Sequence, residues 1–334
     1  MSRAWLAPLG GLYGLGAAAR VALYRRRLLS QAHLPSPVIS VGNLSVGGSG
    51  KTPVVARIAE LLQDAGQPVA ILSRGYRGSF RGESLIVGDG SQVLAGAAEA
   101  GDEPVMLARS LPGVVVAVGR RRDLVGKAVL QRFGPRVLVL DDGFQHLRLA
   151  RDLDILCLDA ADLSDRPLPA GRLREFPRAA WRADLILLSG ADDRRRARCA
   201  QRLGEGRCLP IRRIPRGFFG LDGESRPAPL RPFLVAAIAR PERFRADVDT
   251  LVPSLAGSAF FRDHHPFTVA EVAELDRRAR SLGADALVTT AKDAVRFPSA
   301  ASALPVLVLR TEARAEPEER LWERLLAAIG RRAA

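Results

Sequence analysis

Residues 38–53, VISVGNLSVGGSGKTP, decide the fold of this chain. An apolar run leads into a glycine-rich loop, and the loop leads through Lys51 and Thr52 into a helical pattern of apolar residues. A strand, a glycine loop, Gly-Lys-Thr and a helix in this order are typical of a phosphate-binding loop. The sequence departs from G-x-x-x-x-G-K-[ST] at one position, where Ser45 replaces the first glycine. An ordinary helix start is the alternative interpretation.

The loop suits a nucleotide because it would present free backbone N–H groups and the positive end of a helix dipole to phosphate. Lys51 can reach the β- and γ-phosphates, and the Thr52 hydroxyl can bind Mg²⁺. Pro53 is tolerated in the first helical turn, where an N–H has no intrahelical partner. Ser45 fits if its backbone does not require a positive φ. The predicted nucleotide-binding residues are Ser45, Val46, Gly47, Gly48, Ser49, Gly50, Lys51 and Thr52.

A site of this kind also needs a carboxylate at the end of a neighbouring strand to organise Mg²⁺. Residues 137–142, VLVLDD, supply an apolar run followed by Asp141 and Asp142. A strand followed by a solvated turn is the alternative. With the glycine loop upstream, we predict that Asp141 organises the metal and that Asp142 lies beside it.

Further apolar runs alternate with helical patterns, which predicts an α/β fold with a P-loop NTPase-like parallel sheet, covered by helices on both faces. We expect strands at 35–41, 68–73, 113–118, 136–140, 154–158, 184–188, 233–238, 258–261, 286–290 and 305–309, and helices at 52–65, 269–282 and 317–329. A segment dense in Gly, Pro and Arg over 204–231 is interpreted as a crossing between domains. The predicted units are an N-terminal helix (1–30), a P-loop domain (31–212) and a smaller α/β domain (225–334) that closes the cleft.

Composition limits the class of protein. The 334 residues are 47% hydrophobic and 26% charged, as in a packed globular protein. The net charge of +14 favours an anionic partner: nucleic acid, an acidic membrane surface or a phosphorylated substrate. Three cysteines without CxxC spacing indicate neither a disulfide framework nor a zinc site, and a reducing compartment fits best. Of 50 basic residues only Lys51, Lys127 and Lys292 are lysines.

The N-terminus contains an uncharged, largely apolar stretch over 4–19, followed by Arg20 and by arginines at 25–27. The stretch is short for a membrane span, which needs about 20 apolar residues. We favour an interfacial membrane anchor, in which each arginine facing anionic lipid contributes about 1 kcal/mol. A buried packing helix and a cleaved secretory signal are the alternatives.

Other polar residues are candidates for catalysis. Asp102 and Glu103 precede an apolar helical run and could simply complement a helix dipole. His264 and His265 follow an expected strand, beside Asp263, and could act as a general base with an orienting carboxylate or be structural histidines.

Arginines that follow expected strands could clamp the phosphate of a nucleotide or of a second substrate, with a solvated basic face as the alternative. They include Arg74, Arg77 and residues 120–122.

Taken together and in this order, these residues resemble the tetraacyldisaccharide 4'-kinase family, the lipid A kinases of Gram-negative inner membranes. The matching motifs are GNLSVGGSGKTP (42–53), SRGYRG (73–78), GDEPVMLA (101–108), LDDGFQH (140–146), RDLDI (151–155), LPAGRLRE (168–175), RPERF (240–244), DHHPF (263–267) and TAKDAV (290–295). They cover the chain almost from end to end.

The resemblance implies an enzyme that transfers the γ-phosphate of ATP to the 4'-hydroxyl of tetraacyldisaccharide 1-phosphate, with Mg²⁺, to form lipid IVA at the cytoplasmic face of the inner membrane. It implies that Asp102 acts with His264, or alternatively His265, to activate the sugar hydroxyl. The residues it implies for phosphate and metal are Lys51, Thr52, Glu103, Asp141 and Asp142, and those for the lipid substrate are Arg74, Arg120, His146 and Arg172. No nucleic acid and no obligate protein partner are expected.

Two positions depart from the family pattern. Arg172 stands where a Pro usually follows LPAG, and Ala291 stands where a Glu is usual. A GTP-driven switch or a metallochaperone is the rival function, but guanine selection commonly uses a Lys and an Asp one residue apart, and Lys292 and Asp293 are adjacent. Nucleic-acid binding is disfavoured because aromatic and basic residues are not interleaved.

Overall fold

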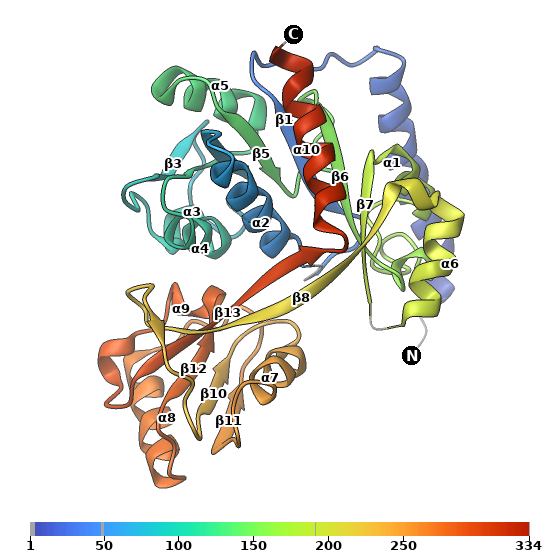
Figure 1. The fold of residues 1–334 in the computed structure, drawn as a ribbon. Coiled ribbons are helices and arrows are strands. Elements are labelled where there is room, and N and C mark those ends of the chain that lie inside the picture. The colour runs from blue at the N-terminus through green and yellow to red at the C-terminus, as the bar shows by residue number, and fades with distance from the viewer. Residues whose placement is uncertain (1–3, 48–49, 191, 334) are drawn as a thin grey trace.

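The computed structural model describes residues 4–47, 50–190 and 192–333, so the predicted nucleotide ligands Gly48 and Ser49 lie outside the described residues. In the described part, one mixed sheet runs through the molecule in the strand order β11-β10-β12-β13-β8-β7-β6-β1-β5-β2-β4-β3, with β9 paired to β8. Figure 1 shows helices packed along this sheet. The prediction of an α/β fold built on a mostly parallel sheet is confirmed.

The large lobe, at the top of Figure 1, carries the glycine loop between β1 and α2. Its strands are β1 (Val38–Asn43), β2 (Val69–Ser73), β3 (Leu85–Asp89), β4 (Val115–Val118), β5 (Val137–Asp141), β6 (Leu153–Asp159) and β7 (Leu185–Ser189). Its helices are α1 (Ala7–Arg25), α2 (Lys51–Asp64), α3 (Ala97–Ala100), α4 (Asp102–Ser110), α5 (Arg122–Phe133), α6 (Asp193–Leu203) and α10 (Glu318–Ala333). Strand β3, which pairs antiparallel with β4, was missed because its apolar run is only three residues long, Leu85 to Val87, before Gly88 and Asp89.

Both faces of the central strands are buried. In β1, Ile39 and Val41 pack with residues of α2 and α10, whereas Val38 packs on the other face with residues of α5. Successive side chains of a strand point to opposite faces, so a strand covered on both sides is apolar throughout. This burial explains why the continuous apolar runs of the sequence located the central strands.

Two long strands link the large lobe to the rest of the sheet. β8 (Cys208–Phe219) starts beside β7, and β13 (Val306–Ala315) starts beside β12, and the two then pair antiparallel (Figure 1). The segment over 204–231 was interpreted only as a crossing, and β13 was expected to end at residue 309. β8 was missed and β13 is longer than predicted, because polar residues such as Arg212 and Arg213 interrupt the apolar pattern of this half-exposed ribbon.

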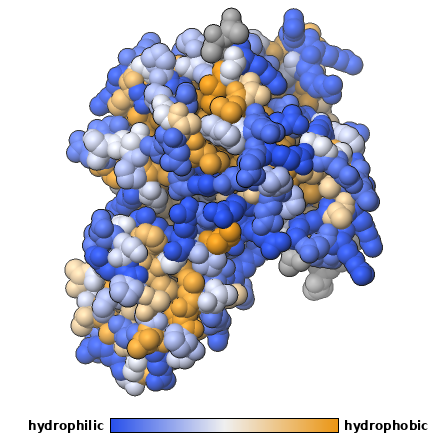
Figure 2. Space-filling model, in the orientation of Figure 1, coloured by the Kyte–Doolittle hydropathy of each residue, from blue (hydrophilic) through white to orange (hydrophobic). Residues whose placement is uncertain are grey.

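The small lobe, at the bottom of Figure 1, completes the sheet. It comprises β9 (Ser225–Arg226), β10 (Phe233–Ala236), β11 (Gly257–Phe260) and β12 (Leu287–Thr290), with α7 (Pro241–Asp249), α8 (Val269–Ser281) and α9 (Ala291–Ala294). Helix α7 covers one face of these strands and α8 the other. Helix α4 of the large lobe contacts α9 of the small lobe. Figure 2 shows hydrophilic residues over the junction between the lobes.

Helix α1 packs through glycine and leaves its apolar side chains outside. A Cβ on Gly14 would lie 2.6 Å from the ring of Phe176, so only glycine permits this approach. The large apolar side chains that remain exposed include Leu9, Leu12, Tyr13 and Leu15 on α1 and Trp5 in the turn just before it. Among the described residues, no helix is long and apolar enough to cross a bilayer.

Candidate active site

The glycine loop begins at the end of β1 and ends at the N-terminus of α2. Gly50 immediately precedes α2 with φ 75°, a left-handed conformation that glycine adopts without a steric cost. Ser45 is not among the described residues with positive φ, so the condition for its fit is met. Its buried hydroxyl donates a hydrogen bond to Asp162 Oδ2 at 3.0 Å. Serine therefore replaces glycine without backbone strain and ties the loop to the segment after β6.

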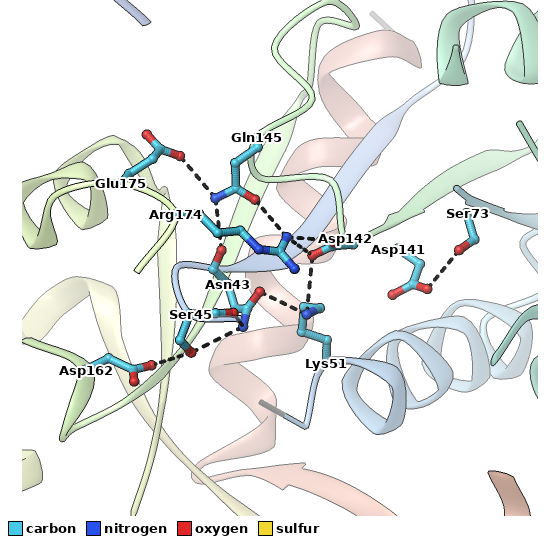
Figure 3. Close-up of polar contacts among 10 residues, drawn as sticks. All are labelled: Asn43, Ser45, Lys51, Ser73, Asp141, Asp142, Gln145, Asp162, Arg174 and Glu175. Atoms are coloured by element: carbon cyan, nitrogen blue, oxygen red, sulfur yellow. Dashed lines mark hydrogen bonds and ion pairs between the residues drawn. The ribbon is translucent and has the colours of Figure 1, made fainter. Parts of the chain in front are cut away.

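Lys51 lies in a network of polar side chains at the end of β1 (Figure 3). Its Nζ donates to Asn43 Oδ1 at 2.9 Å and lies 3.3 Å from Asp142 Oδ1. The Nη1 of Arg174 is 2.8 Å from both carboxylate oxygens of Asp142. Burial raises the pKa of Asp142, but the charges of Lys51 and Arg174 outweigh burial and hold this pKa below its ordinary value. Two cations thus keep Asp142 ionised beside the loop.

Asp141 ends β5 in a different environment from its neighbour. One oxygen accepts a hydrogen bond from Ser73 Oγ at 3.1 Å, whereas the buried Oδ1 has no hydrogen-bond partner within the described residues. Burial, followed by the negative charge of Glu103, raises the pKa of Asp141 to about 7. A buried carboxyl beside a second carboxylate is an environment that a divalent cation would stabilise.

The metal could not be held by protein carboxylates alone. In the described ranges no group of three or more His, Cys, Asp or Glu side chains is arranged to hold a metal ion. Asp141 and Glu103 would therefore need further oxygen ligands, such as the Thr52 hydroxyl at the start of α2 and the oxygens of a phosphate.

Asp102 and His264 are brought together from different lobes. Asp102 opens α4, and its Oδ2 lies 2.8 Å from Nδ1 of His264, which follows β11. The Nε of Arg296 lies 2.9 Å from the other carboxylate oxygen, Oδ1. His265 points elsewhere, because its Nε2 contacts Glu271 at 3.0 Å and its ring stacks on Phe261. Of the two candidate histidines, His264 is the one that faces Asp102.

The candidate substrate residues lie in several places around the loop. Arg74 and Arg120 are exposed and follow β2 and β4, whose carboxyl ends meet at the same sheet edge as the loop. Half-buried His146 has a pKa of about 3, lowered first by burial and then by the charge of Arg122. Arg122, one of the arginines at 120–122 considered as phosphate clamps, is buried there rather than on a solvated face, and burial followed by repulsion from Arg74 lowers its pKa to about 10.

Arg172 belongs to a segment that pairs with the loop. The N–H of Val46 donates to the Arg172 carbonyl at 2.8 Å, and the N–H of Arg174 donates to the Leu44 carbonyl at 2.7 Å. The half-exposed guanidinium of Arg172 pairs with Asp165 at 2.9 Å and with Asp162.

Several polar residues of the site carried no assigned role in the sequence analysis. They are Asn43, Ser73, Gln145, Asp162, Arg174, Glu175, Lys292 and Arg296. Most lie inside the quoted motifs, but a motif does not say which side chains meet. For Lys292, the rarity of lysine in this arginine-rich chain was the available signal.

Comparisons with known proteins agree with one another. A family model described as tetraacyldisaccharide-1-P 4'-kinase matches residues 2–330. The tetraacyldisaccharide 4'-kinase of Desulfotalea psychrophila is 40% identical over 91% of this chain and 90% of its own length, and that of Geobacter metallireducens is 42% identical over 91% of each. The crystal structure of LpxK from Aquifex aeolicus in complex with ATP superposes with a TM-score of 0.81 and 33% identity, covering 98% of this chain and all of that one.

Proposed function

The chain belongs to the tetraacyldisaccharide 4'-kinase family, and from this membership we infer its reaction. It transfers the γ-phosphate of ATP to the 4'-hydroxyl of tetraacyldisaccharide 1-phosphate, forming lipid IVA in lipid A biosynthesis. One observation carries the assignment of the site. The Asp141 carboxyl is close enough to Lys51 and to Glu103 for both charges to act on it. Glu103 directly follows Asp102 in the sequence, at the start of α4. The phosphate-binding end and the Asp102–His264 pair therefore meet around one carboxylate.

The nucleotide phosphates would lie against the N-terminus of α2. Free N–H groups of the loop and of the first helical turn are donors for the phosphate oxygens. Lys51 is held now by Asn43 and Asp142, and its flexible stem allows Nζ to turn towards the β- and γ-phosphates. Arg174 keeps its contact with Asp142 when Lys51 moves, so the carboxylate is not left without a counterion.

Mg²⁺ is the metal that we propose for this site. Asp141, Glu103 and Thr52 would hold it through oxygen atoms, as a hard cation prefers. The unpartnered Oδ1 of Asp141 and the second carboxylate nearby support this fit. Bound there, Mg²⁺ would neutralise charge that develops on the phosphoryl oxygens. Ser73 orients Asp141 by donating to its other oxygen.

The acceptor hydroxyl would be activated by Asp102. With Arg296 beside it, the Asp102 carboxylate can accept the proton that the 4'-hydroxyl loses, while the His264 imidazole orients this carboxylate from the other side. Arg74, Arg120 and His146 are the side chains that we assign to the lipid substrate, together with Arg172. Asp102 belongs to the proposed P-loop domain (31–212) and His264 to the proposed C-terminal domain (225–334). Catalysis would therefore take place in the cleft between these two domains.

We also propose that α1 rests on the cytoplasmic face of the inner membrane. Trp5 is 78% exposed and Leu12 is 66% exposed, and burying such side chains in the interface favours binding. Arg20 is exposed and could also face the lipid, although its Nη1 donates to the carbonyl of Gln145 at 3.1 Å. Deleting residues 1–27 should shift the protein from vesicles of anionic lipid to the supernatant in a flotation assay. A deletion variant that still floats would place the membrane contact elsewhere.

The reaction is tested with purified full-length protein, detergent, Mg²⁺ and γ-labelled ATP. Label should pass to tetraacyldisaccharide 1-phosphate and not to a matched acceptor that lacks the 4'-hydroxyl. Hydrolysis of ATP or GTP at an equal rate with either acceptor, without labelled lipid, would favour a nucleotide-driven switch instead.

A further inference from the structure

The Nε2 atom of His264 has a partner that the proposed reaction does not use. Nζ of Lys292, in α9, lies 3.1 Å from Nε2 and 3.0 Å from Asp263 Oδ1. The lysine side chain is 19% exposed. Only three of the 50 basic residues are lysines, and this is the one at the catalytic histidine.

The hydrogen-bond chemistry of these groups allows one arrangement of protons. A lysine ammonium has three donors and no acceptor, so Nε2 must accept. An ionised carboxylate only accepts, so Nδ1 must carry the proton that is donated to Asp102. His264 is then neutral, with its single ring proton on Nδ1.

Hydrogen bonds to the backbone of Ala237 hold Lys292 and His264 next to each other. Asp293, next to Lys292, accepts hydrogen bonds from the N–H of Ala237 at 2.9 Å and from Thr290 Oγ1. The carbonyl of Ala237 accepts from the N–H of His264 at 3.0 Å. His264 has φ 65°, a strained backbone for a non-glycine residue that these bonds maintain. The end of β10 thus fixes α9 and the histidine loop relative to each other.

We propose that Lys292 is a positioning residue that locks His264 in the neutral tautomer protonated on Nδ1. The charged and titratable groups that face this histidine are Asp102, Asp263, Lys292 and Arg296. Because the ammonium occupies the Nε2 lone pair, His264 does not become an imidazolium that would form an ion pair with Asp102. The Asp102 carboxylate therefore stays available for the proton of the acceptor hydroxyl. The catalytic consequence rests on the proposed function, whereas the tautomer does not.

The tautomer is measured directly by long-range ¹H–¹⁵N correlation NMR of full-length protein labelled at its four histidines. The His264 signals, assigned with His264→Gln, should show a protonated Nδ1 and a bare Nε2 between pH 6 and pH 8. In Lys292→Met, Nδ1 should keep its proton, because Asp102 can only accept, and Nε2 should gain a second proton at the lower pH. Lys292→Arg supplies a donor and should restore the wild-type pattern. Lys127→Met, at an exposed position of α5, is the matched control and should not change it.

Kinetics separates positioning from a role in binding or in folding. Lys292→Met should lower kcat on the order of tenfold, less than loss of the base itself, with KM for ATP and for lipid unchanged. The activity of Lys292→Met should also fall more steeply than that of wild type as the pH is lowered. Asp263→Asn, which removes the negative charge beside Lys292 but leaves an acceptor for its ammonium, should keep the Nδ1–H tautomer.

The outcomes are distinguishable. An Nε2 that stays unprotonated in Lys292→Met down to the lower pH, as in wild type, or a raised KM for lipid with kcat intact, would contradict the proposed role of Lys292. A wild-type protein that shows the lock but labels no lipid would overturn the proposed function and leave the tautomer assignment standing.

Discussion

The phosphate-binding loop and the Asp102–His264 pair are assembled in different ways. The loop is a continuous stretch between β1 and α2, and its geometry follows from local sequence. The pair joins residues 162 positions apart, from α4 and from the loop after β11. A continuous motif can be recognised in a sequence, whereas a site built from two lobes depends on how the whole chain folds.

The two regions also handle charge differently. At the loop, Lys51 and Arg174 both contact Asp142. Lys51 can therefore leave this carboxylate for a phosphate while Arg174 stays. Around Asp102, Arg296 and Lys292 are placed on opposite sides of a carboxylate–imidazole pair. The first region is suited to binding phosphate and the second to moving a proton. Mutations should therefore affect binding at one and the chemical step at the other.

The largest effect is expected at the second region. Asp102→Asn should lower kcat by on the order of 10³, because a positioned general base contributes about 10² to 10⁴. KM for ATP should change little in a steady-state assay with lipid acceptor. His264→Gln should behave similarly, while the control His265→Gln, whose partner is Glu271, should keep most of its activity. A change in KM for ATP alone would place Asp102 in nucleotide binding.

A somewhat smaller effect is expected at the loop. Lys51→Ala should lower kcat/KM on the order of 10²-fold, the scale of removing one preorganised donor from a transferring phosphoryl group. Titration with a non-hydrolysable ATP analogue should show weakened binding, which is not expected for Asp102→Asn. Lys127→Ala is the control for loss of a lysine. Equal loss of affinity in Lys51→Ala and Asp102→Asn would erase the distinction between the regions.

Asp141, between the regions, should make stability depend on pH. Its folded-state pKa of about 7 lies above the ordinary 3.8, so between these values the folded protein holds a proton that the unfolded chain has released. The free energy of unfolding of metal-free protein should therefore fall as pH rises from about 4 to 7. Urea denaturation of Asp141→Asn should lack this contribution. If the free energy of unfolding changed with pH in the same way in wild type and variant, the raised pKa of Asp141 would be contradicted.

The smallest effect is expected at Ser45. Removing its hydroxyl in Ser45→Ala breaks the bond to Asp162 and should lower the free energy of unfolding by about 1 kcal/mol. Asp162→Asn keeps an acceptor at that position and is the milder comparison in the same denaturation experiment. An unaltered stability in Ser45→Ala would mean that the serine only fits the turn.

Sequence reasoning succeeded where physical signals are local. Continuous apolar runs located β1, β5 and β6, because these strands are buried on both faces. It missed β8 and the second half of β13, where arginines and prolines interrupt any continuous apolar pattern. It named Asp102 and His264 but left the choice of histidine open, since only the packing of the small lobe separates His264 from His265. Arg174 and Lys292 were visible in motifs, but their partners lie on other segments.

The most direct measurement follows single-turnover transfer of label from γ-labelled ATP to tetraacyldisaccharide 1-phosphate, with nucleotide bound beforehand, in wild type and Asp102→Asn. Wild type should form ADP and labelled lipid at the same rate. Asp102→Asn should bind the nucleotide with wild-type affinity and lose both products together. Undiminished formation of labelled lipid by Asp102→Asn would contradict the account, because the proton of the 4'-hydroxyl would then be removed elsewhere.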